Sequence, residues 1–118
     1  MTQQQEEAVE ITTQEYKRLV VVTVTGRIDS ATSSDFEAAL QGLMEKGKYN
    51  MALDLAGVDF LSSSGLRVMV STLKTVRQAG GELCIAQPAE QAREAIAIAG
   101  LDALFESFPT REAAIASF

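Results

Sequence analysis

The chain has 118 residues and a formal net charge of −6 at pH 7, with one cysteine and no histidine. This length favours one domain with its own core, and the acidic charge without a basic stripe argues against nucleic acid as a partner. The absence of histidine excludes Ser-His-Asp and Cys-His catalytic sites, and one cysteine cannot make a Cys-rich zinc site. We therefore expect a protein that is not an enzyme and needs no cofactor or metal.

Residues 1–7 are polar and acidic, which predicts a disordered tail ahead of a domain over residues 8–118. The tail lacks the basic and apolar regions of a signal peptide, and no apolar run in the sequence is long enough for a membrane span. Cys84 lies in an apolar run, so we expect it in the core, and a single cysteine fits a reducing compartment. These features predict a cytoplasmic protein without membrane insertion.

The first part of the chain is typical of two strands and a helix. Val9 and Ile11 alternate with polar residues, and residues 19–25 form a nearly continuous β-branched run, so we expect the two strands to pair as a hairpin. Residues 26–30 follow as a loop, and the apolar spacing predicts a helix over about 32–46. Its candidate N-caps are Ser33 and Ser34.

The rest of the chain alternates strands with helices. A buried strand over 51–55 and a turn lead to three serines at 62–64, after which an apolar stripe predicts a helix that ends near Ala79. A strand, a helix and a short strand are then expected at residues 82–86, 88–100 and 104–108. A last helix follows Pro109, with Thr110 as its expected N-cap.

The predicted order of elements is ββαβαβαβα. Strands that alternate with helices argue for an α/β domain. We expect a single domain with a central mixed sheet of about five strands, the first two as a hairpin, and about four helices.

Three consecutive serines, Ser62, Ser63 and Ser64, lie where the third strand and its turn give way to the second helix. One hydroxyl is enough to cap that helix, which contributes about 1 kcal/mol, and serines are common in turns. A phosphoryl group at the same position would be stabilised by free backbone N–H groups and by the helix dipole. On the residues alone, helix capping is favoured over regulation by phosphorylation, and both stay open.

Three aspartates, Asp29, Asp54 and Asp59, are candidate ligands for a hard cation if the fold gathers them at one end of the sheet. Structural roles are favoured instead. Asp29 is expected to anchor the loop after the second strand, and Asp54 to face outward from its strand or to cap a turn.

The segment from Leu53 to Met69, LDLAGVDFLSSSGLRVM, resembles the signature of STAS domains. More narrowly, it resembles that of the stand-alone anti-sigma factor antagonists of bacteria. Residues 26–32, GRIDSAT, are similar to the family's Gly-x-Leu/Ile-Asp segment before its first helix. The resemblance covers about residues 8–118, and the order of strands and helices predicted above agrees with the STAS order.

This resemblance implies a phosphorylation switch. The unphosphorylated form of such a protein binds an anti-sigma factor that is also an ATP-dependent serine kinase, and a sigma factor is released. The kinase then phosphorylates the serine two places before the glycine, here Ser63, and a PP2C-type phosphatase reverses the step. Ser62, at a position that is often Asp in the family, and Ser64 are the rival acceptors. The expected partner-binding residues are Asp29, Ser30, Asp59, Leu61, Ser62, Ser64, Gly65 and Arg67.

The expected effect of the phosphate is repulsion at the interface, because it adds about −1.5 to −2 charge at a helix end that tolerates it. The outer face of the second helix carries Arg67 and Lys74. We favour a solvated surface for this face, with a polar rim of the kinase interface as the alternative.

Two other functions stay open. A STAS module that assists a transporter or a lipid-handling complex would use the serines only structurally and would co-purify with membrane components. A nucleotide-binding sensor that uses the same helix N-terminus would bind a nucleotide saturably. The size of the chain and its few aromatic residues favour a monomer.

Overall fold

The computed structural model of the chain describes residues 9–118, so the tail predicted at residues 1–7 lies outside the described residues. Over this range the chain forms five strands and four helices in the predicted order. They are β1 (Glu10–Glu15), β2 (Val20–Ile28), α1 (Ser33–Glu45), β3 (Asn50–Leu61), α2 (Ser63–Gln78), β4 (Glu82–Ala86), α3 (Glu90–Ile98), β5 (Ser107–Phe108) and α4 (Arg111–Ala116).

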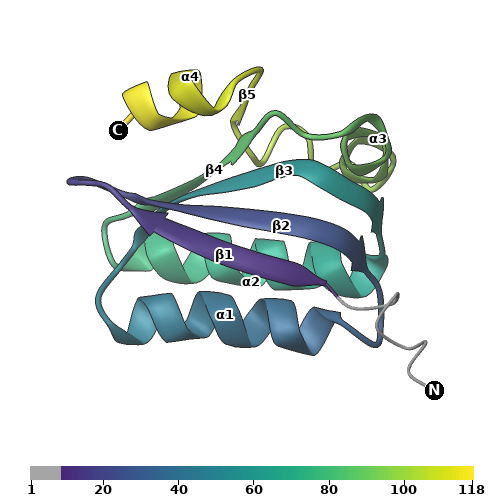
Figure 1. Ribbon diagram of the computed structural model, residues 1–118, viewed down its shortest axis with the longest axis horizontal. Helices are drawn as coiled ribbons and strands as arrows, with labels where there is room; N and C mark the ends of the chain where they lie inside the picture. Colours follow the sequence, from purple (N-terminus) through teal and green to yellow (C-terminus); the bar gives the residue numbers. More distant parts are fainter. Residues whose placement is uncertain (1–8) are drawn as a thin grey trace.

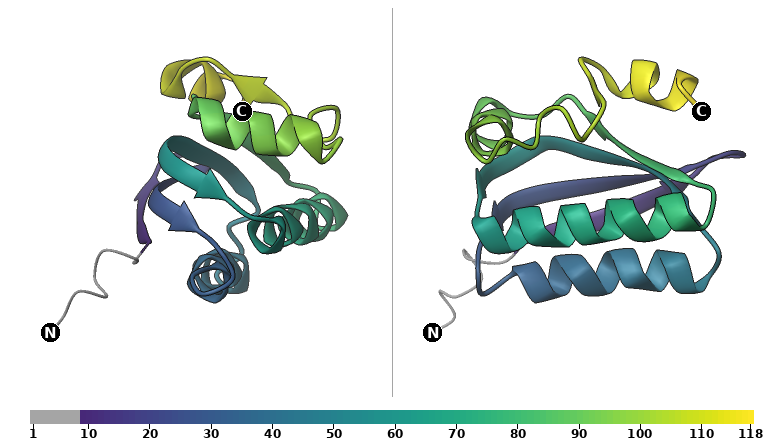
Figure 2. Two further views of the ribbon diagram at one scale, coloured as in Figure 1. Left: turned by 90° about the vertical axis from the view of Figure 1, so that its right-hand side faces the viewer. Right: turned by 180° about the vertical axis from the view of Figure 1, so that it is seen from behind.

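The five strands form one sheet in the order β1-β2-β3-β4-β5 (Figure 1). β1 runs antiparallel to β2, which confirms the predicted hairpin, and β2 to β5 pair in parallel. Helices α1 and α2 cover one face of the sheet, while α3 and α4 lie on the other face (Figures 1 and 2). The predicted mixed α/β architecture is therefore confirmed.

Two strands are longer than predicted. β2 continues through Gly26–Ile28, which the sequence pattern had assigned to a loop, and β3 extends to Leu61 instead of ending at residue 55. The pairing of these strands shifts register after Thr23 and again after Gly26, whose φ is 108°. Such irregularities interrupt the alternation from which a strand is read. As a result, the serines follow a strand directly, with no intervening turn.

Several element ends also differ from the prediction. The N-cap of α1 is Thr32 rather than Ser33 or Ser34, and its hydroxyl donates to the Arg27 carbonyl oxygen at 2.7 Å instead of capping the helix. α3 starts at Glu90, two residues after Pro88, and β5 is confined to two residues. The predicted N-cap of α4 is confirmed, because the Thr110 hydroxyl accepts from the Ala113 N–H at 3.0 Å.

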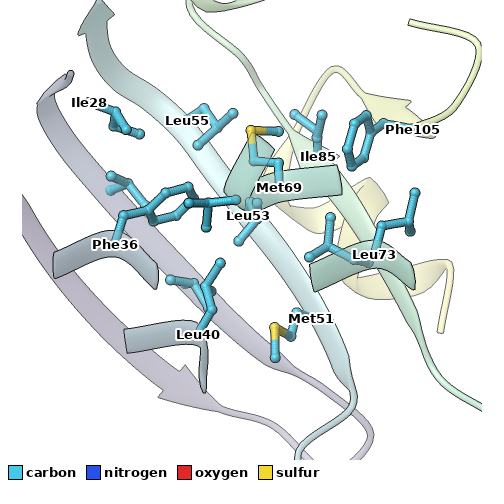
Figure 3. Close-up of a cluster of buried hydrophobic side chains, with 14 of the residues drawn as sticks. Ile28, Phe36, Leu40, Met51, Leu53, Leu55, Met69, Leu73, Ile85 and Phe105 are labelled. Carbon is cyan, nitrogen blue, oxygen red and sulfur yellow. The ribbon is translucent and has the colours of Figure 1, made fainter. Parts of the chain in front are cut away.

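The main core lies between the sheet and the helices α1 and α2. Its labelled side chains in Figure 3 come from these layers and, for Phe105, from the segment between α3 and β5: Ile28, Phe36, Leu40, Met51, Leu53, Leu55, Met69, Leu73, Ile85 and Phe105. A smaller apolar cluster on the opposite face joins α4 to the sheet and contains the predicted core residue Cys84. Burial raises the pKa of the Cys84 thiol to about 11, so this thiol stays protonated.

Candidate functional site

The N-terminus of α2 is built by Ser62, which has extended backbone (φ −87°, ψ 172°) and acts as the N-cap. Its Oγ accepts from the Gly65 N–H at 3.3 Å, and its own N–H donates to the Ile28 carbonyl oxygen at 2.8 Å. Its Oγ also lies 2.8 Å from the Ser64 Oγ, in a hydrogen bond between the two hydroxyls. The capping role of the serine run therefore falls on Ser62.

Ser63 is the first residue of α2, and its side chain is exposed, whereas Ser62 and Ser64 are partly buried. Within residues 9–118 the Ser63 hydroxyl makes no hydrogen bond, while the hydroxyls on either side bond to each other. The first N–H groups of a helix lack intrahelical partners and carry partial positive charge. Of the three serines, Ser63 thus presents the exposed and unengaged hydroxyl at the positive end of the helix.

Gly65 allows the first turn of α2 to approach the ends of two strands. A Cβ at this position would lie 2.6 Å from the Ile28 Cγ2 and 2.8 Å from the Leu61 Cδ1. Gly65 and Leu61 are both buried, so they belong to the packed interior of the junction and not to its surface. The glycine of the motif is thus required by close packing at this junction.

The loop after β2 is anchored by Asp29, as predicted. Its Oδ1 accepts from the N–H groups of Ala31 at 3.0 Å and Thr32 at 3.1 Å, and Arg27 lies 3.6 Å from its Oδ2. Burial opposes ionisation of this carboxyl, but these hydrogen bonds and the nearby Arg27 together hold its pKa below the ordinary 3.8. The result is an ionised carboxylate on a fixed loop.

The Asp29 loop adjoins the serines, because the Ile28 carbonyl bonds directly to the Ser62 N–H. Ser30, next in that loop, is exposed. Asp59 is exposed on β3 and lines a pocket of about 230 Å³ with side chains of α3, among them Glu94. The structure therefore gathers the Asp29 loop at the serines and places Asp59 in a pocket against α3.

Two side chains beside this site were missed by the sequence interpretation. The Arg27 guanidinium lies 4.3 Å from the ring centroid of Phe60, a cation–π contact between the ends of β2 and β3. Phe60 is 40% exposed, which is unusual for a large aromatic residue. The signal in the sequence was an aromatic residue two positions before the serines, which the strand prediction had left in a turn.

Asp54 does not face solvent, so its predicted outward orientation is wrong. Its carboxylate is buried, with the Arg111 Nη1 2.7 Å from its Oδ2, and it also accepts from the Gln87 side-chain amide. The reason is that α4 and the segment after β4 cover this face of the sheet. The alternative role, capping a turn, is not observed either, because the Ala56 N–H that donates to Oδ1 at 3.1 Å lies within β3.

The remaining predicted site residue, Arg67, is exposed one turn into α2, and Lys74 on the same helix is exposed too. In the described part of the chain, no group of three or more His, Cys, Asp or Glu side chains is arranged to hold a metal ion. Nor does any helix there have the length and apolar character needed to cross a bilayer.

Comparison with known proteins gives a consistent result. The family model described as the STAS domain matches residues 10–114. BtrV of Bordetella bronchiseptica, a proposed anti-sigma factor antagonist, is 35% identical over 100 residues, covering 85% of this chain and 86% of BtrV. The anti-sigma-F factor antagonist RsfB of Mycobacterium tuberculosis is 26% identical, with 88% of this chain and 84% of RsfB covered.

Solved structures agree with this assignment. An anti-sigma factor antagonist from Mycobacterium paratuberculosis superposes with a TM-score of 0.85 at 25% identity, covering 94% of both chains. The anti-sigma factor antagonist SpoIIAA in its unphosphorylated form has a TM-score of 0.77 at 18% identity, covering 90% of this chain and 93% of SpoIIAA, which shows a shared fold. The chain thus belongs to the STAS domain family and, within it, to the anti-sigma factor antagonists.

Proposed function

We propose that this antagonist binds, in its unphosphorylated form, an anti-sigma factor that is also a serine kinase, and that phosphorylation of Ser63 releases it. The observation that carries the proposal is that the three serines have different structural roles. Ser62 caps the helix and bonds to Ser64, while the Ser63 hydroxyl is exposed and unengaged within residues 9–118. The names of BtrV and RsfB support an anti-sigma factor as the partner.

The proposed modification is a phosphoryl transfer from ATP. The Ser63 Oγ attacks the γ-phosphorus, the Oγ–P bond forms, and the bond from the γ-phosphorus to the bridging oxygen breaks. ADP leaves with that electron pair, and the hydroxyl proton passes to a base of the kinase. The antagonist supplies the nucleophile and no catalytic group. A PP2C-type phosphatase would restore the hydroxyl by hydrolysis.

Release follows from charge at the interface rather than from unfolding. A phosphate adds about −1.5 to −2 charge, which the N-terminus of α2 tolerates. The ionised Asp29 lies on the neighbouring loop, so the phosphate would increase negative charge that is already present. A partner surface shaped around a neutral hydroxyl would then face steric and electrostatic repulsion. The structure of SpoIIAA has been solved in a phosphorylated form, which supports the proposal that this fold tolerates the modification.

The proposed partner surface is centred on the start of α2. Its exposed or partly buried members are Asp29, Ser30, Asp59, Ser62, Ser64 and Arg67, and the buried Leu61 and Gly65 support it from beneath. We propose that residues 8–118 act as one STAS domain, as a monomer, in the cytoplasm where ATP and the kinase are available.

The proposal is tested by incubating the full chain with the candidate anti-sigma factors of its host and Mg-ATP, followed by intact-mass and fragment analysis. One phosphate on Ser63 is expected, and Ser63→Ala should abolish it. Ser71→Ala removes another exposed serine of α2 and should leave the modification unchanged. A phosphate on Ser62 or Ser64 would reassign the acceptor, and no modification by any candidate would contradict the switch.

A further inference from the structure

Arg67 lies one helical turn after Ser63 on the exposed surface of α2. Residues four apart on a helix are neighbours, with their Cβ atoms about 5–6 Å apart. A helical side chain also covers the turn that precedes its own Cα, so Arg67 extends toward the turn that begins with Ser63. The side chain lines a groove of about 260 Å³ with Ser64 of the same turn and with Ser33 and Glu37 near the start of α1.

Arg67 is distinguished from the other arginines by its lack of a partner. Across residues 9–118 it makes no ion pair and no side-chain hydrogen bond, and Glu37 lines the same groove without pairing with it. Each of the other arginines in that range forms an ion pair with a carboxylate or a hydrogen bond with a carbonyl oxygen: Arg18, Arg27, Arg77, Arg93 and Arg111. An exposed guanidinium with unused donors thus lies four residues after the proposed acceptor on the same helix, in a groove that Ser64 lines.

We propose that Arg67 binds the phosphoryl group once Ser63 carries it, in an ion pair within the first turns of α2. This inference rests on the proposed function and deepens it. A guanidinium offers a planar fork of donors that matches phosphate oxygens in a bidentate contact. The spacing suits Ser63, which is four residues before Arg67, whereas Ser62 is the N-cap outside the helix.

The pair changes what phosphorylation does to the partner surface. In the unphosphorylated protein Arg67 is an available cation at the rim of that surface. After phosphorylation the modification adds negative charge and also engages this cation, so an acidic group on the partner loses its counterpart. Phosphorylation therefore adds a negative charge and engages a positive charge within one helical turn.

The test uses the full chain with phosphoserine installed at residue 63 by genetic encoding, so no kinase is needed. Phosphorylated and unmodified proteins are compared as wild type, as Arg67→Gln and as Lys74→Gln. Lys74 is the matched control, an exposed cation on α2 that lies 11 residues, roughly 16 Å, beyond Ser63. Phosphorylation should raise the folded-to-unfolded ratio about threefold more in the wild type than in Arg67→Gln. Lys74→Gln should behave like the wild type.

The second readout is the Arg67 Nε–H resonance, which reports the contact without unfolding the protein. It should shift and exchange more slowly with water when Ser63 is phosphorylated. An unmoved resonance, or a phosphorylation effect on stability equal in wild type and Arg67→Gln, would overturn the inference. Failure of every host kinase to modify Ser63 would instead contradict the proposed function, and it would leave this measurement unaffected.

Discussion

Asp54 and Arg111 form an ion pair with 2.7 Å between the carboxylate Oδ2 and the guanidinium Nη1, joining β3 to the first residue of α4. The Asp54 side chain is 4% exposed and that of Arg111 is 26% exposed. Burial opposes the charge of Arg111, but Asp54 and Tyr16 together outweigh this effect, so the Arg111 pKa is raised. The pair holds α4 against the face of the sheet opposite α1 and α2.

Replacement of Asp54 by alanine is expected to lower the free energy of unfolding by about 3 kcal/mol, because it leaves a partly buried guanidinium without its carboxylate. Urea unfolding followed by circular dichroism measures this. Glu15→Ala is the control, since it breaks an exposed pair with Lys48 and should change stability by about 1 kcal/mol or less. Equal effects of the two substitutions would mean that the Asp54 pair does not hold α4.

Gly65→Ala is expected to destabilise the protein by about 1–3 kcal/mol, because the added methyl group overlaps Ile28 and Leu61. Gly42→Ala is the matched control. Gly42 lies inside α1, where a Cβ meets nothing within 4 Å, and alanine there should stabilise the helix by about 0.5–1 kcal/mol. Thermal unfolding of the two variants should therefore shift in opposite directions. A shift of Gly65→Ala to higher temperature would contradict the close packing at the junction.

Ser62→Ala is expected to lower the free energy of unfolding by about 1 kcal/mol, because the helix loses its cap. Ser63→Ala should stay within about 0.5 kcal/mol of the wild type, because the exposed hydroxyl supports nothing in the described fold. Denaturant unfolding of both variants separates the structural serine from the proposed acceptor. A larger loss in Ser63→Ala would show that the cap had been assigned to the wrong residue.

The loop beside the serines should be sensitive to acid through Asp29. The folded state holds the Asp29 pKa below 3.8, so the ionised form stabilises the fold at higher pH. This contribution is present above about pH 4 and is lost as the pH falls through the lowered pKa. Asp29→Asn keeps an acceptor oxygen but does not titrate. Unfolding measured from pH 6 to pH 2 should therefore show a steeper decline below pH 4 in the wild type, and parallel curves would refute this.

Local signals predicted the element order well. The β-branched run at residues 19–25 and the Thr110 cap act through neighbouring residues, so a single sequence reveals them. The bulged end of β2 and the continuation of β3 to Leu61 were missed, because register shifts break the alternation on which strand prediction relies. The segment between residue 55 and the serines was therefore predicted as a turn.

The sequence motif of the site was predicted, but the structural role of each residue within it was not. Which serine caps α2 depends on the Ile28 carbonyl, contributed by a strand far away in the sequence. The orientation of Asp54 depends on Arg111, which lies 57 residues later and is brought near only by the complete fold. The role of Gly65 likewise depends on side chains from two strands. Long-range contacts of this kind leave no local pattern to read.

The proposed switch depends on release of the antagonist from its anti-sigma factor by a phosphate on Ser63. The most direct measurement is calorimetric titration of the host anti-sigma factor with the unmodified chain and with chains carrying phosphoserine at 63 or, as a control, at 71. We expect tight binding of the unmodified and Ser71-phosphorylated proteins. Binding of the Ser63-phosphorylated protein should be at least about 100-fold weaker, because like charge at an interface costs several kcal/mol. Unchanged affinity of a folded, Ser63-phosphorylated protein would contradict the proposed switch.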